Sequence, residues 1–258
     1  GKVGGFFTAL MVGIHPFFLG RTMAGLADTD VYSVFFPLMI IWVFFEAFDA
    51  KSINKKIGLG ALAGLLIVIY STAWKGWWHI AGFIFATALI YLTYLALVKL
   101  NIVKMGIIEF LKQKSIKNIF IIITSMSVIP IIFGLIFNTR LILDLIYQPF
   151  NFIQIKSVAA STIWPNIQTT VAELNPASIA TTINQIGGKF LFLIAVVGII
   201  LLFINRKEDY KINIKVISGI LLIIWFLATI YASTKGIRFV LLLVPAFSIA
   251  FGAACGIV

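Results

Sequence analysis

The sequence predicts an all-α membrane protein, a polytopic bundle of about eight transmembrane helices with one long outer loop. Of the 258 residues, 61% are hydrophobic and only 11% are charged, whereas soluble domains carry about 25% charged residues. The mean hydropathy of +1.09 leaves too few polar side chains to cover a water-facing surface. The apolar residues also form runs that are long enough to cross a bilayer.

Eight runs have the required length, because a helix needs roughly 20 apolar residues to cross the hydrocarbon core. They cover about 4–20, 31–49, 57–74, 79–98, 118–137, 189–204, 214–233 and 239–258. Runs such as LLIVIY lack the strict alternation of a membrane β-strand, and a helix satisfies its own backbone hydrogen bonds in lipid. His15 and Pro16 lie inside the first run, where we expect a kinked helix rather than a ligand site.

The basic residues are distributed unequally between the two sets of loops that eight spans create. Thirteen of the 20 lie in the set that includes the N-terminus and the loops near 51–56, 99–117 and 206–215. The positive-inside rule places this set, and both chain ends, in the cytoplasm. The net charge of +11 therefore reflects membrane topology, and we expect the lipid bilayer as a partner and no nucleic acid.

The predicted outer side holds a short loop at 21–30 and a long one at 138–188. The long loop has little regular pattern and exceeds most connections in length, which is typical of a functional segment. The carboxylates of this outer side belong to Asp28, Asp30, Asp144 and Glu173.

Three of the outer residues can carry chemistry. Asp28 and Asp30 are one residue apart, so both can bind one Mg²⁺ or Mn²⁺, which prefer oxygen ligands; the alternative is a solvated turn. Arg238, at the start of the last span, either anchors that helix at the interface or binds a phosphate through its guanidinium fork.

Three segments together resemble one family, the catalytic subunit of bacterial and archaeal oligosaccharyltransferases. RTMAGLADTD at 21–30 resembles the second acidic motif of that family, which joins an arginine to a D-x-D. TVAE at 170–173 resembles the TIxE motif, with valine for isoleucine, and GIRF at 236–239 resembles the segment that supplies an arginine to the lipid pyrophosphate. The three segments occur in the family's order over nearly the whole chain.

The resemblance implies a glycosyltransferase membrane domain of the GT-C type. Such enzymes transfer an oligosaccharide from a lipid-linked pyrophosphate donor to the side-chain nitrogen of Asn in Asn-X-Ser/Thr of an acceptor polypeptide. By resemblance, Asp28, Asp30 and Glu173 hold Mg²⁺ or Mn²⁺, Arg21 lies beside them as a catalytic residue, and Arg238 binds the pyrophosphate. The active site then faces the periplasmic or extracellular side of the cell membrane.

Two parts of the family pattern are missing, namely the first acidic motif and the C-terminal soluble domain with its WWDYG motif. The chain also begins without Met and ends inside an apolar run. We therefore interpret 1–258 as a partial transmembrane catalytic domain, in which 138–188 is the external loop that bears TVAE, and we do not expect it to act alone.

One position bears on the choice of acceptor. Family members that require an acidic residue two positions before the acceptor Asn resemble one another in an arginine about a dozen residues after the TIxE glutamate. Here that position is Gln185, and no arginine occurs from 174 to 205. The resemblance thus implies a peptide contact by Gln185 without selection for an upstream acid.

Two other functions fit parts of the sequence. A related polytopic glycosyltransferase with a lipid-phosphate sugar donor shares an acidic first outer loop, but TVAE in a late outer loop argues against it. A transporter is expected to place ionisable residues at mid-membrane, whereas the acids predicted to be functional lie at the outer surface.

Overall fold

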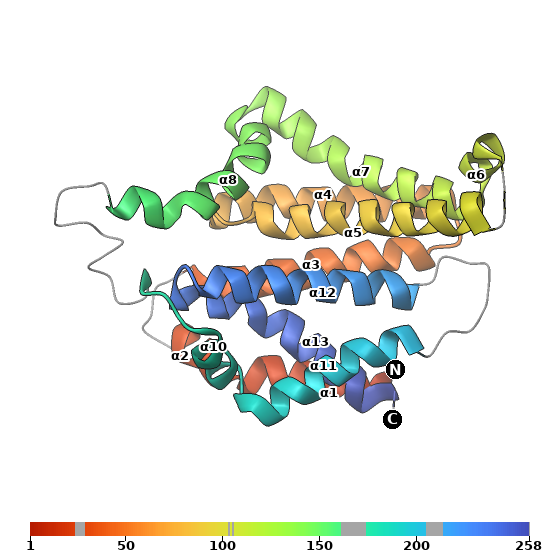
Figure 1. The fold of residues 1–258 in the computed structure, drawn as a ribbon. Coiled ribbons are helices and arrows are strands. Elements are labelled where there is room, and N and C mark those ends of the chain that lie inside the picture. Colours follow the sequence, from red (N-terminus) through yellow and green to blue (C-terminus); the bar gives the residue numbers. More distant parts are fainter. Residues whose placement is uncertain (24–28, 103, 105, 161–173, 205–213, 258) are drawn as a thin grey trace. The chain divides into compact units, whose positions relative to one another are not determined.

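The computed structural model describes residues 1–23, 29–102, 104, 106–160, 174–204 and 214–257, and the regular structure of these residues is helical (Figure 1). They form two compact units. The first unit comprises Gly1–Val34, Tyr147–Arg206 and Leu222–Val258, and the second comprises Phe35–Ile146 and Lys207–Leu221.

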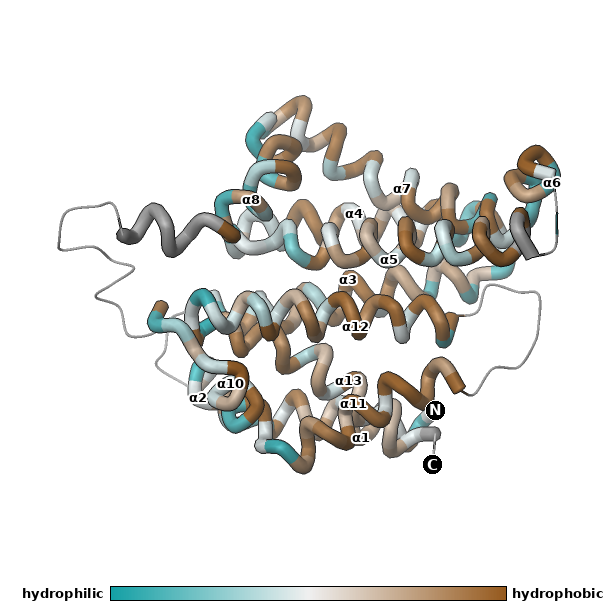
Figure 2. The backbone as a smooth tube through the Cα atoms, viewed as in Figure 1, coloured by the Kyte–Doolittle hydropathy of each residue, from teal (hydrophilic) through white to brown (hydrophobic). Residues whose placement is uncertain are grey.

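Six segments of these units are long and apolar enough to cross a membrane. They are α3 (Asp30–Asp49), α4 (Ile53–Ala73), α5 (Trp78–Ala96), α7 (Lys114–Ile136), α12 (Ile214–Ser233) and the stretch Ile237–Gly256. Two bent helix pairs raise the number to eight if each pair is one span. Figure 2 shows hydrophobic residues along these helices, and the predicted multi-pass helical bundle is confirmed.

Both bends have a cause in the local sequence. α1 (Lys2–Ile14) and α2 (Pro16–Thr22) meet at 51°, because the Pro16 ring is tolerated in the first turn of a helix but not inside one. α10 (Ile179–Gln185) and α11 (Gly188–Ile204) meet at 88°. The φ angles of Gly187 and Gly188 there are +128° and +82°, which glycine adopts without steric cost.

The stretch 138–188 is more regular than the sequence predicted. It contains α8 (Arg140–Ala160) as well as α10, so the expectation of little regular structure was wrong for these segments. Ile142, Ile146, Phe150 and Ile153 recur at helical spacing in α8, which is typical of an amphipathic helix. Polar residues between them keep its hydropathy below that of a membrane span.

In the first unit, α13 (Leu243–Ile257) packs closely against α1 and α11. A Cβ added to Gly4 of α1 would lie 2.6 Å from the carbonyl oxygen of Gly252, and one added to Gly198 of α11 would meet the carbonyl of Ala250. Small residues allow such backbone approach, which gives membrane helices their van der Waals contact.

The segment before α13 is the 3₁₀ helix η3 (Ile237–Leu242). Pro245 lies in the first turn of α13 and has no N–H to offer the carbonyl of Leu241, so the preceding turn does not continue as an α-helix. The indole N–H of Trp225 in α12 donates to the carbonyl of Leu242 at 2.8 Å. This bond fixes the end of η3 against α12.

In the second unit, α4 and α7 form the tightest helix pair. Gly60 and Gly64 of α4 face Ser125 and the carbonyl of Met126 in α7. Lys56 donates to the carbonyls of Ala47 and Phe48 at 3.4 and 3.2 Å, which satisfies the end of α3. The π-helical segment η1 (Leu97–Ile102) and the short α6 (Ile107–Lys112) follow α5.

The α4–α7 contact predicts different effects for two glycines of the same helix. A Cβ at Gly64 would overlap the Met126 carbonyl, whereas a Cβ at Gly58 meets no atom within 4 Å. We expect Gly64→Ala to destabilise the protein by about 1–3 kcal/mol through overpacking. Gly58→Ala, the matched control, should be neutral or stabilising by up to about 1 kcal/mol. Thermal unfolding of the purified variants in detergent measures both, and equal melting temperatures would contradict the close packing of α4 on α7.

Candidate functional site

The candidate site is centred on Asp30, the first residue of α3. Its side chain is buried, with 5% of its surface exposed. The N-terminus of a helix stabilises a carboxylate because unpaired backbone N–H groups concentrate positive charge there. The Ser33 hydroxyl donates to the backbone carbonyl of Asp30 at 2.7 Å and so fixes the first turn that carries the carboxylate.

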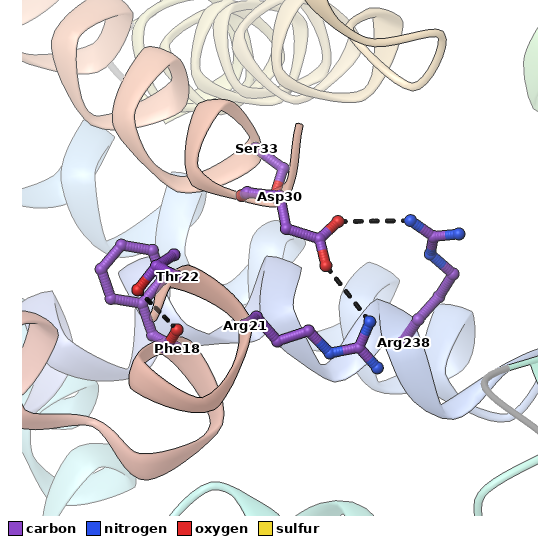
Figure 3. A network of polar contacts seen from close by, with 6 residues as sticks. All are labelled: Phe18, Arg21, Thr22, Asp30, Ser33 and Arg238. Atoms are coloured by element: carbon purple, nitrogen blue, oxygen red, sulfur yellow. Dashed lines mark hydrogen bonds and ion pairs between the residues drawn. The ribbon is translucent and has the colours of Figure 1, made fainter. Parts of the chain in front are cut away.

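Two guanidinium groups bind the two oxygens of this carboxylate (Figure 3). Nη1 of Arg21, from the last turn of α2, lies 3.2 Å from Oδ2, and Nη2 of Arg238, from η3, lies 3.2 Å from Oδ1. All three residues belong to the first unit. Charge-assisted hydrogen bonds of this kind are roughly twice as strong as neutral ones, and they compensate the burial of the aspartate charge.

The three side chains together carry one negative and two positive charges. The arginines are more accessible than the aspartate, with 18% of the Arg21 side chain and 30% of the Arg238 side chain exposed. The Arg21 guanidinium also lies 5.5 Å from the centre of the Phe17 ring, a favourable cation–π arrangement. The exposed part of the Arg238 guanidinium can meet an anion, and the burial of Asp30 contradicts a solvated turn at this residue.

The residues that follow the TVAE segment are attached to the chain segment that carries Arg238. The N–H of Ile237 donates to the carbonyl of Asn175 at 2.8 Å, and the N–H of Ala177 donates to the carbonyl of Ser233 at 3.1 Å. The hydroxyls of Thr182 and Ser233 are 2.7 Å apart and buried. Residues 174–182 are therefore held beside η3 by backbone and hydroxyl hydrogen bonds.

The end of α8 that lies in the first unit approaches the same segment. Nζ of Lys235 donates to the carbonyl of Ile153 at 3.1 Å. The rings of Phe152 and Phe239 meet edge to face with their centres 5.0 Å apart. Chain segments on both sides of 161–173 thus contact residues 233–239, next to Arg238.

His15 connects the bend between α1 and α2 to the end of α10. Its Nδ1 accepts the N–H of Phe17 at 3.2 Å, so Nε2 carries the proton and donates to the carbonyl of Ile186 at 3.2 Å. The ring is buried and packs edge to face on Phe247. This agrees with the predicted packed, kinked helix and adds a contact that the sequence did not suggest.

The structure brings together three of the predicted site residues, Arg21, Asp30 and Arg238. The sequence did not predict that Arg238 pairs with Asp30, and no local signal connects residues 208 positions apart. Asp28 and Glu173 lie outside the described residues. Gln185 is exposed at the end of α10.

The structure can be compared with the predicted metal site at one residue, because Asp28 and Glu173 lie outside the described residues. Within the described part of the chain, no three His, Cys, Asp or Glu side chains are grouped so as to hold a metal ion. Of the three predicted ligands the structure describes Asp30, and both its oxygens accept from guanidinium groups. Thr182, Ser233 and Lys235 are further residues of the site that the sequence analysis missed, because their roles come from tertiary contacts.

The sequence of this chain is similar to archaeal proteins. It is 31% identical to a dolichyl-phosphooligosaccharide-protein glycotransferase of Methanococcus voltae, over 99% of this chain and 30% of the relative. It is 28% identical to the protein of the same name from Methanocaldococcus jannaschii, over 99% of this chain and 35% of the relative. The chain thus spans about a third of the length of the curated relatives it matches.

The fold is similar to a solved structure of the Archaeoglobus fulgidus oligosaccharyltransferase AglB, described in complex with an inhibitory peptide and a dolichol-phosphate. The TM-score is 0.57 at 16% identity, over 98% of this chain and 36% of the solved one. A crystal structure of the oligosaccharyltransferase from the same organism in the apo form matches with a TM-score of 0.56 at 15% identity. The family described as oligosaccharyl transferase STT3, N-terminal, matches residues 1–257, and the chain belongs to this family.

Proposed function

We propose that this chain is the membrane part of an oligosaccharyltransferase that transfers an oligosaccharide from a lipid-linked pyrophosphate to the Asn side chain of Asn-X-Ser/Thr. The observation that carries the proposal is the contact of Arg21 and Asp30, from one motif, with Arg238, from another. The names of the archaeal relatives support the same activity.

The donor end of the reaction requires a group that binds phosphate. Arg238 offers a guanidinium that is fixed on one side by Asp30 and is 30% exposed on the other. Planar guanidinium groups match the oxygens of a phosphate in charge and geometry. Arg238 is therefore the proposed ligand of the lipid pyrophosphate.

The acceptor end requires activation of a carboxamide nitrogen, which is a poor nucleophile. Carboxylates that accept its N–H bonds raise its electron density and orient it toward the sugar. We assign this role to Asp28 and Glu173, which also offer oxygen ligands for Mg²⁺ or Mn²⁺. When bound, such a cation supplies charge neutralisation to the departing pyrophosphate.

The attachment of residues 174–182 supports the assignment of Glu173. Leu174 is the next residue in the chain, and its Cα lies 3.3 Å from the position of a Cβ on Gly236, two residues before Arg238. The described chain directly after Glu173 therefore contacts the segment that carries Arg238. Asp30 is the third proposed ligand of the cation, and its two carboxylate oxygens accept hydrogen bonds from Arg21 and Arg238.

Transfer of a lipid-linked oligosaccharide to a sequon peptide by the full-length protein tests the function directly. In that protein Arg238→Ala should raise the KM for the donor tenfold or more, since a hydrogen bond to a charged group contributes about 1.5–3 kcal/mol. The KM for the peptide should change less than about threefold. Absence of transfer by the full-length protein would refute the activity, and an unchanged donor KM would leave Arg238 as an interfacial anchor.

We also propose that the site faces the outside of the cell and that both ends of this chain are cytoplasmic, because the basic residues are concentrated in the other set of loops. With Cys255→Ser as background, a membrane-impermeant maleimide should label Pro176→Cys in intact cells and not Lys112→Cys. Both positions are exposed, so each should react after the membrane is permeabilised. Labelling of Lys112→Cys from outside would contradict the topology.

Gln185 is the proposed contact for the acceptor residue two positions before Asn. It is exposed and precedes Ile186, whose carbonyl is bound by His15. The Gln185 amide can hydrogen-bond a carboxylate of the acceptor peptide but carries no charge. Compared with an arginine at this position, it therefore favours an acidic peptide residue less, by on the order of 1–3 kcal/mol. Two peptides that differ only in Asp or Ala at this position should react at rates within a few-fold. A preference of about a hundredfold for Asp would contradict the assignment, and Gln185→Arg should introduce such a preference if it is correct.

A further inference from the structure

The end of the second unit at which α4 and α7 begin carries exposed lysines that the proposed function does not use. Gly60 of α4 faces Ser125 of α7, and Gly64 faces the carbonyl of Met126, so the two helices run parallel and begin at the same end. The exposed lysines there form what we call the lysine surface: Lys51, Lys55, Lys112, Lys114 and Lys117. We propose that the lysine surface binds the headgroups of anionic phospholipids in the adjacent leaflet of the bilayer.

The backbone holds three of these lysines close together. α6 ends at Lys112 and α7 begins at Lys114, and the N–H of Gln113 between them donates to the carbonyl of Phe110 at 3.1 Å. Lys117 follows Lys114 by three residues, so both side chains lie on the same face of α7. One phosphate-bearing headgroup can therefore meet more than one ammonium group.

Lys56 fixes the start of α4 against the neighbouring helices. It is buried, and its ammonium group donates to the carbonyls of Ala47 and Phe48 at the end of α3. The ammonium group of Lys114 is near enough to repel it. The lysines at the start of α4 and those at the start of α7 thus belong to one surface.

The acids at this end do not balance the lysines. Within residues 46–56 and 106–117, both of which the structure describes, six lysines occur together with Glu46, Asp49 and Glu109. No side chain of the lysine surface forms an ion pair with another described residue. A cluster of about four to eight basic residues beside a membrane span is typical of binding to anionic lipids, since an ammonium group pairs with a phosphate as a compact charge.

Exposed aliphatic side chains beside the lysines point to a lipid rather than a soluble anion. Phe110 anchors α6, with 7% of its surface exposed, whereas Ile107, Ile108 and Leu111 are 68%, 72% and 51% exposed. α6 contacts the start of α7 (Figure 1), so these side chains lie where a membrane span begins. Aliphatic side chains at that level enter the boundary between headgroups and acyl chains, while lysines extend to the phosphates. A soluble anion offers these aliphatic side chains no contact.

The inference goes beyond the proposed function, because neither the donor nor the acceptor takes part in it. The proposed topology places the lysine surface at the cytoplasmic leaflet, which carries the negative surface potential. An anionic headgroup between α4 and α7 also offsets the repulsion among their lysines. We therefore expect bound lipid to stabilise the α4–α7 pair.

The test uses the full-length protein in dodecyl maltoside, with native mass spectrometry of bound lipid. The wild type should bind phosphatidylglycerol at least tenfold more tightly than phosphatidylcholine with the same acyl chains. The triple variant Lys112→Gln/Lys114→Gln/Lys117→Gln should raise the dissociation constant of phosphatidylglycerol at least tenfold, because each basic residue near an anionic surface contributes to binding. It should change that of phosphatidylcholine less than twofold.

Two further variants separate the site from total charge and from misfolding. The matched control removes three exposed positive charges elsewhere on the chain and should change either dissociation constant less than twofold: Lys75→Gln/Arg140→Gln/Lys189→Gln. The charge-conserving variant Lys112→Arg/Lys114→Arg/Lys117→Arg should retain the preference for phosphatidylglycerol. Phosphatidylglycerol should raise the melting temperature of the wild type more than that of the glutamine variant.

Four results would overturn the proposal. They are equal affinity of the wild type for the two lipids, equal losses in the glutamine variant and its matched control, and loss of the preference in the arginine variant. The fourth is binding of glycerol phosphate as tight as that of phosphatidylglycerol, which would make the ligand a free phosphate.

A second arm measures whether α6 contacts the bilayer. With Cys255→Ser as background, a spin label at Ile108→Cys in nanodiscs that contain phosphatidylglycerol should collide with oxygen more often than with a water-soluble nickel chelate. A label at Lys75→Cys, exposed in the α4–α5 turn, should show a lower ratio of oxygen to nickel collisions. A ratio at Ile108 equal to or below that at Lys75 would contradict the lipid contact. Nanodiscs present both leaflets and neither arm requires turnover, so failure here leaves the proposed function and topology standing.

Discussion

The carboxylate of Asp30 is buried at the start of a membrane-spanning helix, where an unpaired charge would cost several kcal/mol. Two arginines compensate it, and this requirement determines where three chain segments lie. The end of α2, the start of α3 and η3 must meet at one point. The charge of Asp30 therefore organises the candidate site, and the remaining contacts of the first unit support the approach of these three segments.

The backbone departs from regular α-helix in two segments near Asp30, and both departures help to bring the arginines to its carboxylate. The bend at His15 redirects the chain before Arg21, and the 3₁₀ turn ahead of Pro245 presents Arg238. Each departure from α-helical geometry frees backbone groups, which in a membrane protein need partners within the protein. His15 and Trp225 provide some of them by bonding Ile186 and Leu242. The regular helices thus support the fold, and their interruptions carry the site.

Residues 233–239 connect the two halves of the proposed chemistry. Arg238 lies within this segment, and the chain that follows TVAE is bonded to it through Asn175, Ala177 and Thr182. The first unit therefore holds Arg238, the proposed donor arginine, and the chain that follows TVAE in one compact body. This arrangement suits a reaction in which donor and acceptor must be aligned before transfer.

Composition and the length of the apolar runs determined the membrane class, the helical architecture and most of the spans, because in lipid each helix satisfies its own backbone. Short stretches of sequence also predicted the kink at Pro16 and showed the order of the three motifs. The sequence analysis missed α8 (Arg140–Ala160), because its polar residues keep its hydropathy below that of a membrane span. The functional roles of all the predicted site residues remain predictions: Arg21, Asp28, Asp30, Glu173, Gln185 and Arg238. Only the tertiary structure decided that Arg238 pairs with Asp30, since a contact across 208 residues depends on helix packing that no local pattern encodes.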